Sequence, residues 1–162
     1  MHALHARAMQ VVMSGRTELA LRLRTPSSTS WLHVSWHPVA ARVVAGGSPP
    51  RGAASEAYGL GEQLARCLQG SVLVGVRMPS PWERVVRLEF GERPGAPPSH
   101  ALLAEVMGRY SNAVLVEEPD GTIAACAMQV GVAWGWRLVE RVEREGWAGF
   151  CCACQGWAGF CC

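Results

Sequence analysis

Two clusters of charged and polar side chains hold most of the groups in this chain that could do chemistry. One is the run Glu83-Arg84-Val85-Val86-Arg87, and the other is residues 105–112, Glu-Val-Met-Gly-Arg-Tyr-Ser-Asn. In an extended strand Arg84 falls on the same face as three apolar residues, where alternation calls for another apolar side chain. Local rules tend to break at functional sites. A guanidinium offers a planar fork of donors that matches a carboxylate or a phosphate, so these clusters form the candidate site.

No complete catalytic constellation accompanies these clusters. His33 and His37 flank Trp36, which would allow metal binding or general-base work, but no third ligand and no activated nucleophile stand at a meaningful spacing. Glu83 and Glu105 are candidates for the paired carboxylates of a hydrolase, yet nothing in the sequence brings them together. Phosphate-loop and cofactor fingerprints are missing as well. We therefore expect a protein that is not an enzyme, with no catalytic residues, no cofactor and no small-molecule substrate.

The cysteines do not indicate a metal site either. Five of the seven lie in the last twelve residues, at Cys151, Cys152, Cys154, Cys161 and Cys162. Adjacent cysteines without a nearby histidine lack the spacing of a structural zinc site. The other two, Cys67 and Cys126, sit among apolar residues, which is typical of small core residues in a reducing compartment.

The end of the chain differs in character from the rest. The run 146–152, Gly-Trp-Ala-Gly-Phe-Cys-Cys, recurs at 156–162, and a ten-residue repeat used twice cannot build a solenoid. Residues 136–144 carry the charge pattern of a short amphipathic helix. We interpret 131–162 as an atypical Cys/Trp-rich tail that is non-native or disordered.

Composition narrows the class of protein. A length of 162 residues fits one domain with a tail, and 49% hydrophobic with 17% charged residues is typical of a soluble globular protein. No apolar run approaches the roughly 20 residues of a membrane-spanning helix, so no membrane partner is expected. The net charge of +2 is too small to favour nucleic-acid binding by bulk electrostatics, and any such binding must use a local patch. Residues 1–17 lack acidic side chains, a pattern shared with organelle transit peptides.

The clusters must be positioned by a strand-rich domain. Alternating hydrophobicity predicts seven short strands, at 18–24, 31–36, 72–78, 84–90, 102–107, 113–117 and 122–128. Helical spacing predicts one helix over 56–69, although Gly59 and Gly61 weaken it. Residues 108–112 then form a hairpin turn, and Asp120-Gly121 forms the next one. The order of elements predicts an α+β domain.

Residues 15–130 resemble the NFACT-N domain, the N-terminal domain of the family of fibronectin-binding protein A and RqcH. The resemblance rests on the order of elements as well as on motifs: 18–24, Val34-Ser-Trp-His-Pro-Val-Ala-Ala-Arg42, Ser48-Pro-Pro50, Leu64-Ala-Arg-Cys-Leu68, 83–90 and 104–116. The run Met-Gly-Arg-Tyr-Ser-Asn is similar to the bacterial form of the family. The family's opening helix has no counterpart in residues 1–14, which we set apart as a divergent leader. This sequence also has no counterpart of the family's helical hairpin, coiled coil and second RNA-binding domain. The chain is therefore similar to a truncated member of the family.

The resemblance implies a fold and a function. The fold would be an antiparallel β-sandwich or barrel-like sheet with one or two flanking helices, as in the N-terminal domain of formamidopyrimidine-type DNA glycosylases. The function would be to bind tRNA and the large ribosomal subunit during ribosome-associated quality control, where a stalled chain gains an untemplated C-terminal tail. The family's acidic-arginine pair, which contacts the tRNA anticodon arm, falls on Glu83 and Arg84, although relatives usually carry aspartate at the first position. The residues expected to contact tRNA are Glu83, Arg84, Arg87, Arg109, Ser111 and Asn112.

Alternatives remain open at this point. Each charged candidate could instead form a surface ion pair, and Arg109, Ser111 and Asn112 could serve turn geometry, with Asn112 suited to a left-handed residue. A glycosylase-like nucleic-acid-binding domain is a second interpretation, but the chain starts Met-His-Ala without the Pro-Glu those enzymes use. A non-functional truncated gene product is a third, and an adhesin would need an export signal that is not visible. The expected location is ribosome-associated, in the cytoplasm or the plastid stroma.

Overall fold

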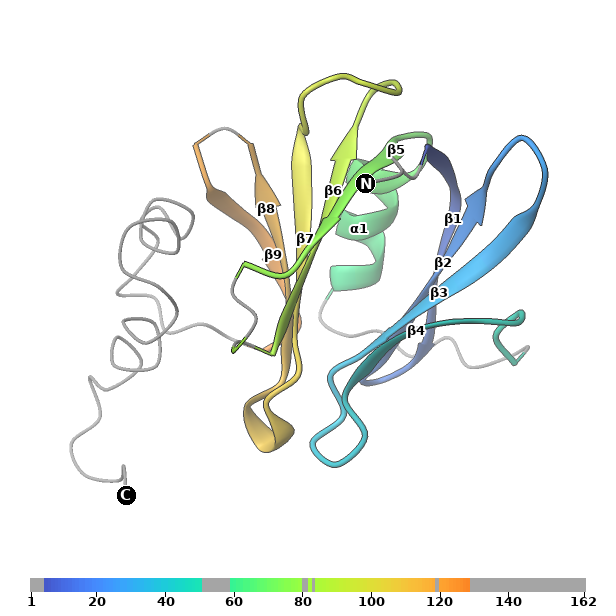
Figure 1. Ribbon diagram of the computed structural model, residues 1–162. Helices are drawn as coiled ribbons and strands as arrows, with labels where there is room; N and C mark the ends of the chain where they lie inside the picture. Colours follow the sequence, from blue (N-terminus) through green and yellow to red (C-terminus); the bar gives the residue numbers. More distant parts are fainter. Residues whose placement is uncertain (1–4, 51–58, 80–81, 83, 119, 129–162) are drawn as a thin grey trace.

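A computed structural model of the chain describes residues 5–50, 59–79, 82, 84–118 and 120–128 (Figure 1). Its elements are β1 (Ala6–Gly15), β2 (Glu18–Arg24), β3 (Thr29–Ser35), β4 (Arg42–Gly46), α1 (Leu60–Leu68), β5 (Val72–Arg77), β6 (Val85–Gly91), β7 (His100–Glu105), the 3-10 turn η1 (Gly108–Tyr110), β8 (Asn112–Glu117) and β9 (Thr122–Cys126). The strands form one sheet in the order β4-β3-β2-β1-β5-β6-β7-β8-β9. Every neighbouring pair is antiparallel.

The sheet has two halves, β1–β4 and β5–β9, that meet at a narrow corner. Within the described residues the strand ladder between them has two residue pairs, Ala6 with Leu73 and Arg7 with Val72. The halves then diverge, and α1 lies between them and packs against β1 and β9 (Figure 1). Within the described residues β4 and β9 are the two edges, so the sheet curls around the helix without closing into a barrel.

Two layers of apolar side chains hold this arrangement. The larger cluster joins α1 to the inner faces of both halves and includes Leu64, Leu21 and Phe90, each fully buried. The smaller cluster lies on the other face of β6–β8 and includes Val85, Leu103 and Val114. Strands buried on both faces read as nearly continuous apolar runs, which explains the sequence of β7 and β8.

The α+β class is confirmed, because the described residues form an antiparallel sheet and one α-helix, but this sheet is open where a sandwich or barrel was expected. The helix begins at Leu60, after Gly59 in the left-handed conformation at φ 74°, four residues later than predicted. Gly61 is a packing residue, because a Cβ there would lie 2.6 Å from Cγ of Met13 on β1. The missing side chain of Gly61 weakens an isolated helix, but here it allows the helix to lie close to β1.

Two strands were not predicted. Residues 1–14, set apart as a divergent leader, include most of β1, which lies in the middle of the sheet between β2 and β5. Its pattern is irregular because the β1–β2 ladder carries register shifts near Met9 and Ser14. The second missed strand, β4, is a short edge strand with exposed side chains, which gives little alternation. The tail, 131–162, lies outside the described residues.

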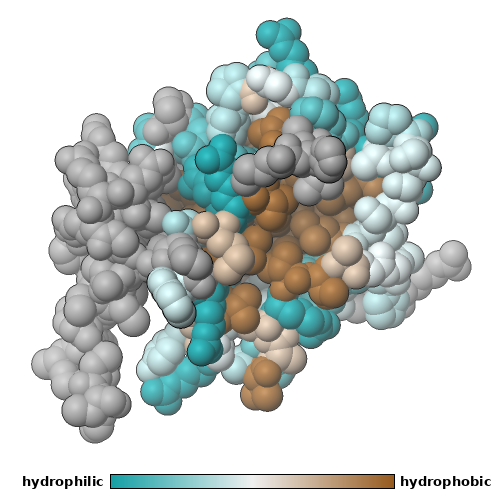
Figure 2. Space-filling model, in the orientation of Figure 1, coloured by the Kyte–Doolittle hydropathy of each residue, from teal (hydrophilic) through white to brown (hydrophobic). Residues whose placement is uncertain are grey.

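The open side of the sheet leaves apolar surface exposed. Figure 2 shows hydrophobic surface in the middle of this face, in the region between the two halves. Val76 and Met78, at the end of β5, are among the large hydrophobic side chains that remain exposed. No helix of the described part is both long and apolar enough to cross a membrane.

Candidate nucleic-acid interface

The two polar clusters of the sequence meet at one end of the sheet. β6 starts there and β7 ends there, with Val85 paired to Glu105. One residue further out, the Val106 amide donates a 2.7 Å hydrogen bond to the carbonyl oxygen of Arg84. The turn between β7 and β8 therefore lies beside the entry to β6, at the lower end of the molecule in Figure 1. We call this the loop end of the sheet.

Arg84 and Arg109 are the exposed cations of these two clusters. Arg84 precedes β6 by one residue, and its guanidinium makes no hydrogen bond or ion pair with any residue the structure describes. Arg109 lies in η1, with its guanidinium carbon 4.8 Å from the ring centre of Tyr110. Tyr110 is 65% exposed, so the stacked pair presents a planar aromatic surface and a charge to solvent.

Ser111 and Asn112 shape the turn from inside. The Ser111 hydroxyl accepts from the Met107 amide at 2.9 Å and donates to the Gly108 carbonyl at 2.7 Å. The Asn112 side-chain oxygen accepts from the amides of Ala113 and Met128, each at 2.9 Å, which ties the start of β8 to the chain just after β9. Both side chains are buried. The left-handed residue of this turn is Gly108, at φ 59°, not Asn112.

Arg87 lies inside an ion-pair network on the outer face of β5 and β6. Its Nε donates to Glu89 at 3.2 Å, and a terminal nitrogen pairs with Glu118. Arg77 donates to the second oxygen of Glu89 at 3.0 Å. The Arg87 side chain is 15% exposed, so its charge is directed to these carboxylates rather than to solvent.

Glu105 is the one buried carboxyl of the described residues that has an oxygen, Oε1, without a hydrogen-bond partner. Its neighbours in register are Val85 on β6 and Asn112 on β8. Burial raises the pKa of Glu105 to about 7, because an apolar environment penalises the charged form. Close to neutral pH this carboxyl therefore carries less than a full negative charge.

Two further strand connections reach the loop end. The Trp36 amide donates to the Thr17 carbonyl at 2.9 Å, which joins the β1–β2 turn to the end of β3. A Cβ on Gly108 would lie 3.7 Å from the Pro38 carbonyl oxygen, so the β3–β4 loop lies close to η1. These connections carry Arg16 and His37, both exposed. Among the expected contact residues, sequence reasoning did not name Arg16, which lies outside both polar clusters, or Tyr110, which lies within the 105–112 cluster but has an uncharged side chain.

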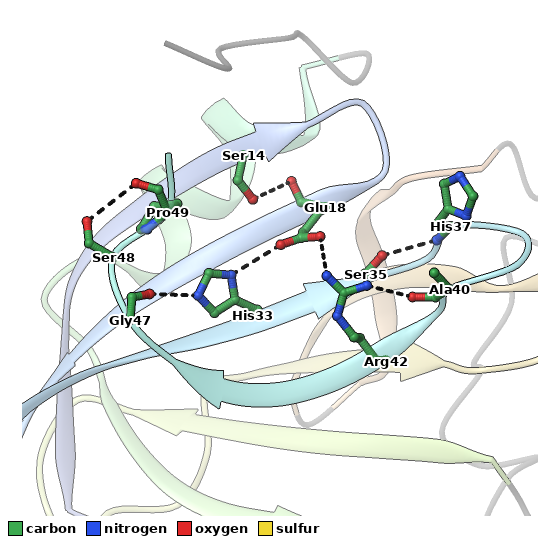
Figure 3. A network of polar contacts seen from close by, with 10 residues as sticks. All are labelled: Ser14, Glu18, His33, Ser35, His37, Ala40, Arg42, Gly47, Ser48 and Pro49. Atoms are coloured by element: carbon green, nitrogen blue, oxygen red, sulfur yellow. Dashed lines mark hydrogen bonds and ion pairs between the residues drawn. The ribbon is translucent and has the colours of Figure 1, made fainter. Parts of the chain in front are cut away.

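The β1–β4 half has its own polar network, drawn in Figure 3. Arg42 donates to the Glu18 carboxylate at 3.0 Å, and Nδ1 of His33 lies 3.2 Å from the same carboxylate. Nε2 of His33 lies 2.9 Å from the Gly47 carbonyl oxygen. These contacts fix β4 and the following loop to β2 and β3. Because Glu18 is paired with His33 and Arg42, the described residues of the β1–β2 and β3–β4 connections offer no unpaired carboxylate at the loop end.

Of the predicted contact residues, Arg84 and Arg109 are exposed cations at the loop end, whereas Ser111 and Asn112 are buried. It holds Arg87 on the outer face, while Glu83 lies outside the described residues. No group of three or more histidine, cysteine or acidic residues in the described part could hold a metal ion. Cys67 and Cys126 are both free thiols of intermediate burial.

Comparison with solved structures supports the fold. The chain is similar to the N-terminal domain of fibronectin-binding protein PavA from Streptococcus pneumoniae, with 21% identity and a TM-score of 0.66 over 81% of this chain and 49% of that chain. The N-terminal part of the fibronectin/fibrinogen-binding protein from Streptococcus suis gives the same values. A fibrinogen-binding protein from Staphylococcus aureus gives 16% identity and a TM-score of 0.64 over 79% and 45% of the two chains. This chain thus spans about half the length of the structures it matches.

A comparison with curated protein sequences finds no match. The family model for NFACT N-terminal and middle domains, in contrast, matches residues 2–134, a range that includes every element of the sheet and the helix. A match of this extent decides the family, and the chain belongs to the family of NFACT N-terminal and middle domains.

Proposed function

We propose that this domain binds tRNA on the large ribosomal subunit and acts in ribosome-associated quality control, where stalled chains receive an untemplated C-terminal tail. Peptidyl transfer in this scheme belongs to the ribosome, and the domain is a binding module. The observation that carries the proposal is the pair of exposed guanidinium groups, Arg84 and Arg109, at one end of the sheet.

The charges around this pair favour an anionic ligand. Among the described residues Arg84 and Arg109 have no ion-pair partner, and the Arg109 guanidinium lies over the Tyr110 ring. Glu105, the last residue of β7, is buried with its pKa raised to about 7. A local positive patch can therefore exist on a chain whose net charge is only +2.

The groups also suit RNA with unpaired bases. A guanidinium can bind a phosphate through two donors or stack on a base, and an exposed tyrosine ring offers a stacking surface. Single-stranded loops of RNA present both features, whereas the bases of a duplex are stacked inside. The Arg109–Tyr110 pair would take an unpaired base, and Arg84 would take a neighbouring phosphate.

Binding of tRNA by Arg84→Ala and Arg109→Ala variants tests this proposal. We expect each substitution to weaken binding, with a change of about 1 to 3 kcal/mol for a contact to a base. A lost phosphate contact also lowers the slope of log K against log salt by about 0.7 to 0.9. Fluorescence anisotropy with labelled tRNA, measured across a salt series, gives both quantities.

Arg93→Ala is the matched control, since Arg93 is an exposed arginine in the β6–β7 loop, at the opposite end of the strands. Equal affinities and equal salt slopes for wild type, Arg84→Ala and Arg109→Ala would refute the proposal. Binding of immobilised fibronectin without binding of tRNA would favour the ligand named for two of the structural neighbours. Trapping of a Schiff base on abasic DNA would favour the glycosylase interpretation.

A further inference from the structure

The loop end of the sheet is built from both halves, although the predicted site uses only one. The turns β1–β2 and β3–β4 come from the first half, and the β5–β6 and β7–β8 connections come from the second. The halves lie close together at this end, because a Cβ on Gly108 would be 3.7 Å from the Pro38 carbonyl oxygen. In Figure 1 the β3–β4 loop and the β7–β8 turn lie side by side at the bottom of the molecule. A ligand bound to Arg109 would therefore meet the β3–β4 loop.

Arg16 is the first group that the β1–β4 half brings to the loop end. It lies in the β1–β2 turn, is exposed, and makes no hydrogen bond or ion pair with a residue that the structure describes. Its neighbour Glu18 faces Arg42 and His33 and does not neutralise it. The Trp36–Thr17 hydrogen bond, at 2.9 Å, anchors this turn beside the β3–β4 loop. An exposed arginine without a partner among the described residues is suited to contact a phosphate.

His37 is the second group, and its hydrogen bond with the backbone shows which ring nitrogen carries the hydrogen. The Val39 amide donates to Nδ1 of His37 at 3.2 Å, so this nitrogen is an acceptor and carries no hydrogen. The ring hydrogen is then on Nε2, which has no partner among the described residues. Figure 3 shows the His37 ring pointing away from the network of Glu18, His33 and Arg42. The ring is a neutral hydrogen-bond donor directed to solvent.

We propose that the RNA interface extends across the loop end onto the first half of the sheet, with Arg16 as a phosphate contact and His37 as an uncharged hydrogen-bond donor. This inference rests on the proposed function, because it names further residues of the same interface. The two residues differ in their expected salt dependence. Loss of a cation that displaces counterions lowers the salt slope, whereas loss of a neutral donor leaves it unchanged.

The test measures tRNA affinity of the full chain across a salt series for Arg16→Ala, His37→Asn and the control Arg24→Ala. We expect Arg16→Ala to weaken binding severalfold and to lower the salt slope by about 0.7 to 0.9. His37→Asn retains an oxygen that can accept from the Val39 amide but has no donor at the Nε2 position, so the loop is kept while the contact is lost. We expect it to weaken binding severalfold with an unchanged slope.

Arg24 is exposed at the far end of β2, without a partner among the described residues, so Arg24→Ala changes the net charge equally and should leave the affinity near that of wild type. Wild-type affinity of both Arg16→Ala and His37→Asn, in a protein that Arg84→Ala and Arg109→Ala still weaken, overturns this inference and leaves the proposed function standing. Wild-type affinity of all four variants overturns both. A weakening by Arg24→Ala as large as that by Arg16→Ala would attribute the effect to net charge and also overturn the inference.

Discussion

At the scale of single residues, Glu105 is predicted to make the stability of the domain depend on pH. Its pKa rises from 4.5 to about 7 in the folded state, so between these values the folded protein binds more protons than the unfolded chain. Stability then falls as pH rises from about 4.5 to 7 and is constant above that range. Glu105→Gln removes the charge with little change in shape, and we expect it to raise the free energy of unfolding at pH 8 by about 1 to 3 kcal/mol.

Urea denaturation of wild type and Glu105→Gln at pH 5 and pH 8 measures this effect. The gain should be present at pH 8 and small at pH 5, because the wild-type carboxyl is protonated there. A gain of the same size at both pH values would contradict the prediction and indicate a packing effect. Glu117→Gln is the control, since Glu117 is an exposed carboxylate at the other end of β8.

Sequence reasoning named residues that lie in and around the candidate site, but it could not predict the contacts that several of them make. The positions of Arg84 and Arg109 follow from the motif and from the hairpin between the strands. The role of Arg87 depends on Glu118, 31 residues away, which no local pattern indicates. Asn112 likewise serves a hydrogen bond to Met128, which only the strand pairing brings near. Contacts between distant residues are set by topology, and sequence spacing does not encode them.

At the scale of elements, the pairing of β5 with β6 depends on a glycine. Gly75 lies opposite Glu89, and a Cβ on Gly75 would be 2.3 Å from Oε2 of Glu89. The Glu89 side chain is 10% exposed and holds both Arg77 and Arg87. Gly75→Ala must displace this carboxylate, and we expect a loss of about 1 to 3 kcal/mol in the free energy of unfolding, because buried charges would lose partners.

The control for Gly75→Ala is Gly15→Ala, at the end of β1, where an added Cβ meets no atom within 4 Å. Thermal unfolding should distinguish the two, with a clear fall in Tm for the β5 variant and a small change for the other. A Tm for Gly75→Ala equal to that of wild type would mean that Glu89 moves aside without cost. The network around Arg87 would then not support the pairing of β5 with β6.

Elements with regular alternation were predictable, and those at irregular positions were not. β2 was predicted with both of its boundaries, since its leucines alternate with polar or small residues. β1 pairs with two neighbours and carries register shifts, so its burial pattern lacks a period of two. The end of the helix, at Leu68, was predictable to within one residue from the glycine at position 70, whereas its start depends on the left-handed Gly59.

At the scale of the whole molecule, β1 joins the two halves of the sheet, so the domain should not fold without it. β1 pairs with β2 along most of its length, with β5 at the corner, and packs against α1. Deletion of residues 1–15 would expose the apolar faces of β2 and α1 and leave no strand between β2 and β5. We expect the deletion variant to lose cooperative unfolding, as measured by circular dichroism and urea titration, and to lose tRNA binding with it.

Deletion of residues 1–4 is the matched control, since it removes chain that precedes β1 and keeps the strand intact. That variant should unfold cooperatively, with a midpoint close to that of wild type. If removal of residues 1–15 instead left a cooperative transition of unchanged midpoint, β1 would be dispensable. The interpretation of the first residues as a separate leader would then hold, and the loop end would need another source of contact between the halves.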